Sequence, residues 1–269
     1  MNTMKTPIIY IPHGGGPMPL LDEPNHQSLV SFLSTTQSQL GQPKAILMIS
    51  AHWEEDIATV SSGQQPELIY DYYGFPKQSY EINYPAKGSP QLAQKILSML
   101  ESKGIEAKPD SNRGFDHGTF VPLKLIFPKA DIPVVQLSLV NNLDPQAQIN
   151  LGKAIGELSN QGVLIIGSGM SFHNLQVLMS KAPEVLEKSK NFDRWLNNVI
   201  IGEQLNPQVQ EAELVNWANA PDAQFAHPRE EHLLPLHVCF GAAQTAGLIA
   251  ENVFNQELLG AKTSAFLWQ

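Results

Sequence analysis

Residues 44–54 read K-A-I-L-M-I-S-A-H-W-E. Residues 45–49 form an unbroken apolar run of strand length, which indicates a strand buried on both faces of a parallel sheet. The run ends at Ser50-Ala51-His52-Trp53. Because ligands and reactive groups collect beyond the carboxyl ends of strands in open α/β sheets, this stretch puts His52 where chemistry is expected.

A second strand with a histidine at its end lies near the start of the chain. Residues 7–11 are apolar and lead into Pro12-His13-Gly14-Gly15-Gly16-Pro17-Met18. Three glycines without Cβ atoms let the backbone turn sharply and pass close to a bound group. We therefore expect His13 and His52 at the same edge of one sheet.

The rest of the chain alternates helical and strand patterns, which predicts an α/β fold with a central, mostly parallel or mixed sheet and helices on both faces. No linker or fixed-period repeat divides the 269 residues, so we expect a single catalytic domain over 1–269. Helices are expected at residues 25–40, 89–104, 121–127, 145–158, 183–202 and 207–217. Further strands are expected at residues 58–60, 132–140 and 163–166, with two more at 252–269 closing a sheet edge.

Composition limits the partners and the compartment. Lys plus Arg number 17 against 26 Asp plus Glu, a net charge of -9, and the scattered basic residues argue against nucleic acid and anionic membranes as partners. Residues 1–5 lack the build of a signal peptide, and no apolar run reaches membrane-helix length, so we expect a cytoplasmic protein. The one cysteine, Cys239, lies in an apolar helical stretch and is expected to be a buried thiol. The oligomeric state is not predicted.

A third histidine follows another strand. Residues 163–166 lead into Gly167-Ser168-Gly169-Met170-Ser171-Phe172-His173-Asn174. The third glycine of a dinucleotide loop is missing, so we expect no such cofactor, and no Gly-x-Ser-x-Gly elbow of a serine hydrolase occurs there. What the stretch supplies is His173.

The remaining histidines divide into candidates and others. Residues 226–235 are expected to open a helix that runs through residue 241, with an acidic first turn and with Glu231 and His232 at its open end. His237 lies five residues further on, about 140° around that helix, so it cannot face the same ion and is expected to be a packing or surface residue. His26 and His227 stand in loops and are expected at the surface.

His117 is a fifth candidate. It follows Asp116 where a helix is expected, with Pro122 in the first turn. Two readings are open: His117 faces the site, or Asp116 caps the helix and His117 is exposed.

The Gly63 to Pro85 segment is a long loop rich in aromatic residues. These side chains either pack the loop onto the body or line an aromatic substrate pocket. They are Tyr70, Tyr72, Tyr73, Phe75, Tyr80 and Tyr84.

Four separate segments thus present His13, His52, His173 and His232. No short motif such as His-Glu-x-x-His is present. Histidine ligands without thiolates suit one divalent metal ion, Zn²⁺ or non-haem Fe²⁺.

Five motifs, in this order, resemble the class III extradiol ring-cleavage dioxygenases, in the 4,5-DOPA extradiol dioxygenase branch, from about Ile8 to Ala242. They are Pro12-His13-Gly14-Gly15-Gly16-Pro17-Met18, Ser50-Ala51-His52-Trp53, Gly114-Phe115-Asp116-His117-Gly118, His173-Asn174-Leu175 and Glu231-His232-x-x-Pro235-Leu236. The resemblance implies an oxidoreductase that opens the ring of a DOPA-like catechol with O₂.

The resemblance also implies roles for individual residues. His13, His52 and His232 would bind the metal. His173 would be either a fourth ligand or the acid/base, and His117 would be a second active-site histidine that hydrogen-bonds an oxygen. An all-histidine site departs from the two-histidine, one-carboxylate set of many iron oxygenases.

Two other functions stay open from the residues. In a zinc hydrolase the same three histidines, His13, His52 and His232, would hold zinc, and Glu231 would be the base. In a non-enzymatic binding protein the cleft would be kept without ring cleavage.

Overall fold

The computed structural model describes residues 5–180, 182–202 and 204–269. Residues 1–4, on which the expectation of no signal peptide partly rests, lie outside this range. None of the helices in the described ranges is long and apolar enough to cross a membrane.

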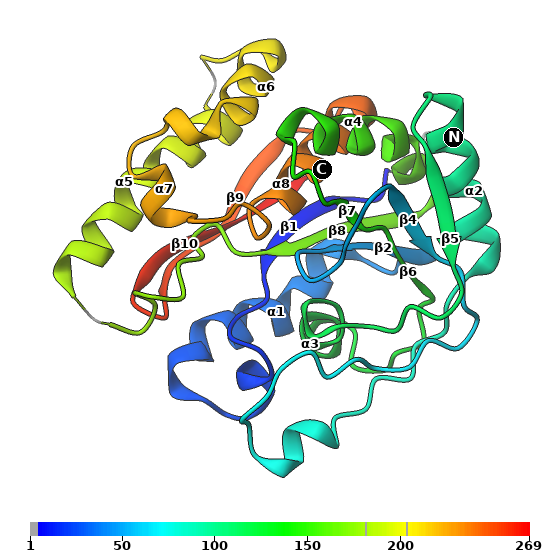
Figure 1. The fold of residues 1–269 in the computed structure, drawn as a ribbon, viewed down its shortest axis with the longest axis horizontal. Coiled ribbons are helices and arrows are strands. Elements are labelled where there is room, and N and C mark those ends of the chain that lie inside the picture. The colour runs from blue at the N-terminus through cyan, green and yellow to red at the C-terminus, as the bar shows by residue number, and fades with distance from the viewer. Residues whose placement is uncertain (1–4, 181, 203) are drawn as a thin grey trace.

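A six-stranded mixed sheet forms the centre of the molecule (Figure 1). Four strands are parallel, and the C-terminal hairpin adds two antiparallel strands at one edge, as predicted. In spatial order the strands are β6 (Val134–Gln136), β2 (Ala45–Ser50), β8 (Val163–Gly169), β1 (Ile8–Pro12), β10 (Ala261–Trp268) and β9 (Ala250–Leu258).

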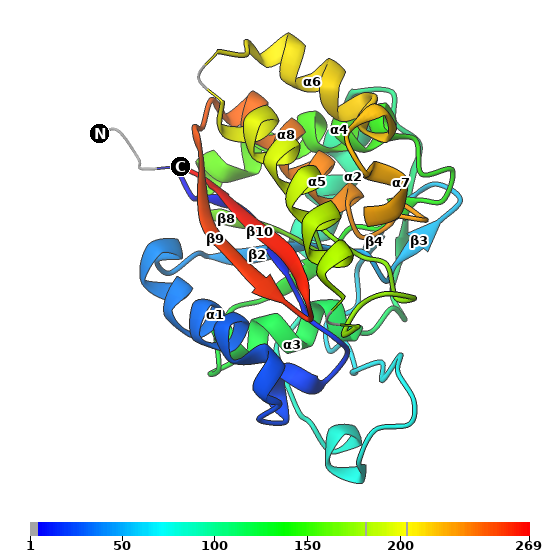
Figure 2. The same ribbon diagram turned by 90° about the vertical axis from the view of Figure 1, so that its left-hand side faces the viewer.

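Helices cover both faces of the sheet, which confirms the predicted α/β class (Figure 2). On one face lie α1 (Gln27–Leu40) and α3 (His117–Ile126). On the other lie α2 (Pro90–Ser102), α4 (Pro145–Ile155), α5 (Pro183–Ile201) and α8 (Leu234–Ala246), with α6 (Pro207–Val215) and α7 (Ala223–Ala226) next to α5.

Alternate side chains of the parallel strands enter two separate cores. In β1, Ile8 and Tyr10 pack with the α4 and α8 side, whereas Ile9 and Ile11 pack with α1 and α3. All four are fully buried. This is why β1 and β2 read as continuous apolar runs rather than as alternating ones.

The strand expected at residues 132–140 is broken in two, so that prediction was wrong. After β6 the chain leaves the main sheet, and β7 (Leu139–Val140) pairs with β3 (Glu54–Glu55). The strand predicted at 58–60 is β4 (Ala58–Ser61), which pairs with β5 (Ala107–Asp110) outside the main sheet. An apolar sequence predicts that a strand is buried, but it does not predict which neighbouring strand it pairs with.

Two helix starts differ from the predictions. Helix α3 begins at His117, so Pro122 lies in its second turn rather than its first. The helix expected to open within residues 226–235 with an acidic first turn begins only at Leu234, after Glu230 and Glu231. The helix expected to end at residue 158 changes at residue 156 into a 3₁₀ segment, Gly156–Gln161.

Candidate metal centre

Strands β1, β2 and β8 end level with one another. Pro12 pairs with Gly169, and Ser50 pairs with Ser168. One residue further on, the His13 backbone N–H donates to the Gly169 carbonyl at 3.1 Å. His13 and His52 therefore leave the same edge of the sheet, as the sequence predicted, from strands that flank β8.

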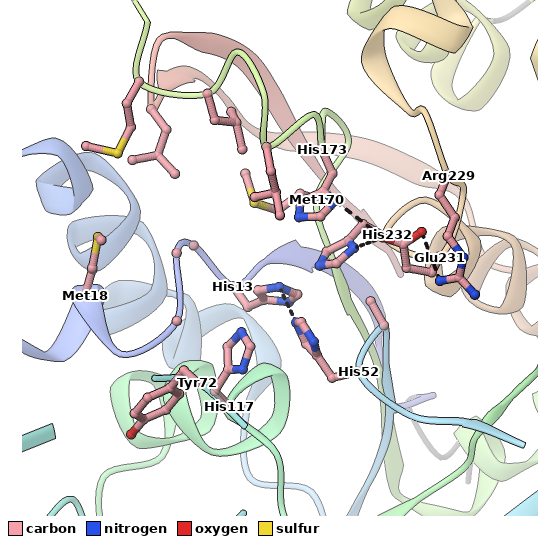
Figure 3. A pocket seen from close by; sticks show the side chains of 18 of the residues that line it. His13, Met18, His52, Tyr72, His117, Met170, His173, Arg229, Glu231 and His232 are labelled. Carbon is pink, nitrogen blue, oxygen red and sulfur yellow. Dashed lines mark hydrogen bonds and ion pairs between the residues drawn. The ribbon is translucent and has the colours of Figure 1, made fainter. Parts of the chain in front are cut away.

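Three imidazole rings meet at this edge (Figure 3). The ring centres of His13, His52 and His232 are 4.9, 5.2 and 5.0 Å apart in pairs. One nitrogen of each ring lies within 4.8 Å of the others, and the Nε2 atoms of His13 and His52 are 3.2 Å apart. Segments separated by up to 219 residues of chain, from His13 to His232, thus present three donor atoms to one point.

His13 is oriented by a hydrogen-bond chain that ends in helix α3. Its Nδ1 lies 3.0 Å from Ser168 Oγ, and the Ser168 hydroxyl donates to the Gly118 carbonyl. That carbonyl lacks its usual helical partner because residue Pro122, four positions on, has no N–H. We assign Nδ1–H to His13 on these contacts, which leaves its Nε2 lone pair facing the other two rings.

His232 is held in the same manner by a carboxylate. Its Nδ1 lies 2.8 Å from Glu231 Oε1. Its backbone carbonyl accepts from the Tyr10 hydroxyl at 2.9 Å and from Met170 N–H at 3.0 Å, which ties the residue to β1 and β8. A carboxylate only accepts, so Nδ1 carries the proton and Nε2 is free.

The donor set fits a divalent metal ion. Burial, followed by the neighbouring histidines, lowers the pKa of His13 well below its ordinary value and that of His52 to about 4. Burial also lowers the pKa of His232, so all three rings are neutral and offer lone pairs. Two nitrogens about 2.1 Å from one ion stand roughly 3.0 to 3.4 Å apart, which matches the His13 to His52 separation.

His117 enters the site from the start of α3. Asp116 caps this helix by accepting from Thr119 N–H at 3.0 Å, as the second reading expected. His117 is only 6% exposed and lines the cavity, as the first reading expected, so the exposed position was wrong. Asp71 Oδ1 accepts from the His117 backbone N–H and lies 2.9 Å from its Nδ1. The second oxygen of Asp71 lies 3.7 Å from His52 Nδ1.

His173 stands beside the three rings rather than among them. It stacks on His232 with ring centres 3.4 Å apart, and its Nδ1 lies 3.4 Å from Glu231 Oε1. Among the described residues, the group of nitrogens close enough to share an ion with His13 and His52 contains His232 and not His173. Burial raises the pKa of Glu231, but hydrogen bonds with His173 and His232 outweigh it, and the pKa lies well below its usual value.

A cavity of about 660 Å³ opens in front of the rings. The aromatic loop contributes Tyr72 and Phe75 to its wall. Tyr84 lies in the core, and Tyr80 and Phe75 pack against it, whereas Tyr73 is exposed, so the loop serves both packing and the cavity wall.

Two of the other histidines are not at the surface, and that expectation was wrong. His26 is fully buried, and its Nε2 accepts from Gly15 N–H beneath the glycine turn. His227 is buried beside Phe192, with its Nε2 3.1 Å from the Ser171 carbonyl. His237 is a packing residue, as one reading of the sequence had it.

Sequence reasoning missed two supporting residues. Asp71 lies inside the aromatic loop, and no local pattern marks it. Ser168 sits at the end of a strand between two glycines, so its position at the sheet edge was a signal that could have found it.

The profile of the catalytic LigB subunit of aromatic ring-opening dioxygenase matches residues 5–267. The chain belongs to this family. Dioxygenases of the family use a metal, in keeping with the histidine cluster. Members act on a small aromatic substrate and O₂.

Individual relatives agree. The chain is 36% identical to Dioxygenase tasH of Hapsidospora irregularis, over 97% of this chain and 85% of that protein. It is 40% identical to the 4,5-DOPA dioxygenase extradiol of Beta vulgaris, over 87% and 85% of the two chains. A crystal structure of an uncharacterized Escherichia coli K12 protein superposes with a TM-score of 0.81 at 25% identity, over 98% of this chain and 99% of that one.

Proposed function

We propose that the protein cleaves the ring of a catechol next to its diol, with both atoms of O₂ entering the product, and that Fe²⁺ is the metal used in turnover. The observation that carries this proposal is the convergence of neutral His13, His52 and His232 at the inner end of a cavity. A ferrous ion bound there would activate the catechol and dioxygen toward each other.

His173 is placed to move a proton in this reaction. Its Nδ1 faces the Glu231 carboxylate, so its Nε2 is the atom left to take the proton of a catechol hydroxyl. The adjacent carboxylate stabilises the imidazolium that forms. The nitrogens of His173 do not belong to the group formed by His13, His52 and His232, which favours the acid/base role of His173 over that of a fourth ligand.

His117 is placed to hydrogen-bond an oxygen of the reacting molecules. Asp71 Oδ1 holds its Nδ1 at 2.9 Å, which leaves Nε2 as the ring atom that can make this bond. Tyr72 packs against this ring, with centres 5.9 Å apart, and limits access of water to it.

The geometry supports ring cleavage better than zinc-dependent hydrolysis. A hydrolase would need a free carboxylate as base. Glu231 Oε1 is engaged by His232 and His173, and its Oε2 lies 3.3 Å from Arg229 Nη1. A carboxylate held by three cationic or N–H partners is a poor base.

The test is oxygen uptake by protein reconstituted with Fe²⁺ without oxygen and then mixed with a catechol panel that includes L-DOPA. A zinc-loaded sample is the control. We expect iron-dependent uptake and a coloured product heavier than the substrate by one O₂. Hydrolysis without oxygen uptake would favour the hydrolase, and tight metal binding with no turnover would favour a binding protein.

Metal binding itself is tested by His13→Ala and His52→Ala. Each should lose stoichiometric metal, because each removes one of three donors. The control is His237→Gln, since His237 is also buried but lies outside the cluster. Full metal content in either alanine variant would contradict the assignment.

A further inference from the structure

We propose that the substrate carries an apolar substituent on its catechol ring, and that Leu175, Leu178, Met179 and Leu259 bind it. We call these four residues the apolar wall; all of them line the cavity in front of the histidines. The inference deepens the proposed ring cleavage and rests on it for the position of the ring.

The cavity is larger than a single ring requires. Its volume of about 660 Å³ lies within the range of pockets that enclose molecules of several rings or long chains. A catechol at His13, His52 and His232 would fill only the end next to these rings. The remaining space needs a substituent to fill it.

The residues around that space are apolar even where they meet water. Leu175 is 75% exposed and Met179 is 53% exposed. Large apolar side chains gathered at the mouth of a cavity indicate a ligand that covers them. Met18 and Met170 also line the cavity, and methionine adapts to apolar ligands of varied shape (Figure 3).

The backbone of the apolar wall makes the same point independently. Met179 has φ of 70° and Leu259 has φ of 54°, and Met179 N–H donates to the Leu259 carbonyl at 2.7 Å. Glycine and asparagine suit this left-handed region better than long apolar residues do. Leu259 packs in the core, which accounts for its side chain, but Met179 is 53% exposed, so neither the turn nor packing accounts for its apolar side chain, whereas an apolar ligand does.

The charged part of the cavity is poorly suited to an amino-acid substituent. Arg229 donates to both oxygens of Glu54, at 2.7 and 2.6 Å, and Glu231 lies beside it. Two carboxylates thus surround one guanidinium, which is the only Lys or Arg side chain among the described lining residues. A substrate carboxylate would find no free cation there. Figure 3 shows Arg229 and Glu231 on the opposite side of the histidines from Met18.

The first experiment compares substrates of the iron-loaded enzyme. The panel is catechol, 4-methylcatechol, 4-butylcatechol, dopamine and L-DOPA. We expect kcat/KM to rise with chain length, by up to about fourfold for each buried methylene. L-DOPA should lie below 4-butylcatechol. A flat series, or a preference for L-DOPA or dopamine, would overturn the proposal.

The second experiment changes the apolar wall. Met179→Asn suits the left-handed backbone and removes the apolar side chain, and Leu175→Gln keeps the side chain's length. In both variants kcat/KM should rise less with the length of the alkyl chain than in the wild type. The control is Ile249→Gln, at an 80% exposed residue outside the cavity, in which kcat/KM should rise with chain length as in the wild type. An unchanged dependence in both wall variants would overturn the proposal.

The third experiment separates this proposal from ring cleavage. 4-Alkylphenols lack the second hydroxyl, and their binding is measured by calorimetry. Binding that tightens with chain length, and does so less in the wall variants, supports the apolar wall even if no catechol is cleaved. If catechols are cleaved but neither kcat/KM nor phenol binding depends on chain length, the proposal about the apolar wall is wrong and the proposal of ring cleavage stands.

Discussion

At the residue scale, Glu231 contacts two histidines of the proposed site. It accepts from His232 Nδ1 at 2.8 Å and lies 3.4 Å from His173 Nδ1. We predict that Glu231→Gln lowers metal affinity by about 10- to 100-fold. A neutral amide does not fix the tautomer of His232 as a carboxylate does, and it leaves the His232 Nε2 atom less basic and so a weaker ligand. Metal titration of the purified variant measures this.

The neighbouring carboxylate provides the control for that prediction. Glu230 is adjacent in the chain, and no side-chain contact with the histidines involves it. Glu230→Gln should keep the wild-type affinity. If the two variants bind metal equally well, Glu231 does not support His232.

Asp71 tests the other side of the site. Asp71→Asn should lower kcat by about tenfold or more while metal content stays at one ion per chain, because Asp71 hydrogen-bonds His117 at 2.9 Å, whereas its other oxygen lies 3.7 Å from His52, beyond hydrogen-bond distance. Combining it with His117→Ala should add little further loss. Additive losses in steady-state kinetics would show that Asp71 acts separately from His117.

At the element scale, close approach of α3 to β2 positions His52. A Cβ on Gly118 would lie 2.5 Å from Ser50 Oγ and 3.0 Å from His52 Cδ2. We predict that Gly118→Ala weakens metal binding by about tenfold, although alanine is the better helix former, because His52 must move. Metal titration and chemical denaturation together separate the local effect from unfolding.

The glycine turn after His13 supplies a matched control. Gly15 has an ordinary backbone conformation, and a Cβ there would have no neighbour closer than 3.6 Å. Gly15→Ala should bind metal as the wild type does. Gly14 and Gly16 differ, since their φ values of 81° and 55° require glycine. Equal losses in Gly15→Ala and Gly118→Ala would contradict the crowding argument.

Sequence patterns predicted most elements because each depends on local residues. Ser89 and Pro90 fixed the start of α2, where the Ser89 hydroxyl accepts from Leu92 N–H. The start of α3 was missed because a proline normally marks the first turn. Here Pro122 sits in the second turn, and the carbonyl it frees is bound by Ser168, which no local rule includes.

At the scale of the whole molecule, three buried histidines outside the metal centre make stability depend on pH. Burial lowers the pKa of His26 to about 4, of His227 to about 3 and of His237 to about 4, from an ordinary value near 6.5. Below about pH 6.5 these histidines bind protons in the unfolded chain but stay neutral in the folded chain. The free energy of unfolding is therefore greatest above that pH, and it decreases as the pH falls from about 6.5 toward 4 and 3.

Each of these histidines should contribute a slope of up to about 1.4 kcal/mol per pH unit in that window. Urea denaturation of the metal-free protein above, within and near the bottom of the window measures it. His237→Gln removes one titrating group and should give a shallower slope. A free energy of unfolding that does not change between about pH 7 and 5 would contradict this account.

The sequence by itself determined the α/β class and placed His13, His52 and His173 after strands, because apolar runs and the turn residues that end them act over a few residues. Only the tertiary structure decided that β8 lies between β1 and β2, and that His232 returns beside their ends. It also decided that Asp71 faces His117, since these contacts join residues far apart in the chain. Pairing across such distances depends on how whole elements pack, which no local pattern encodes.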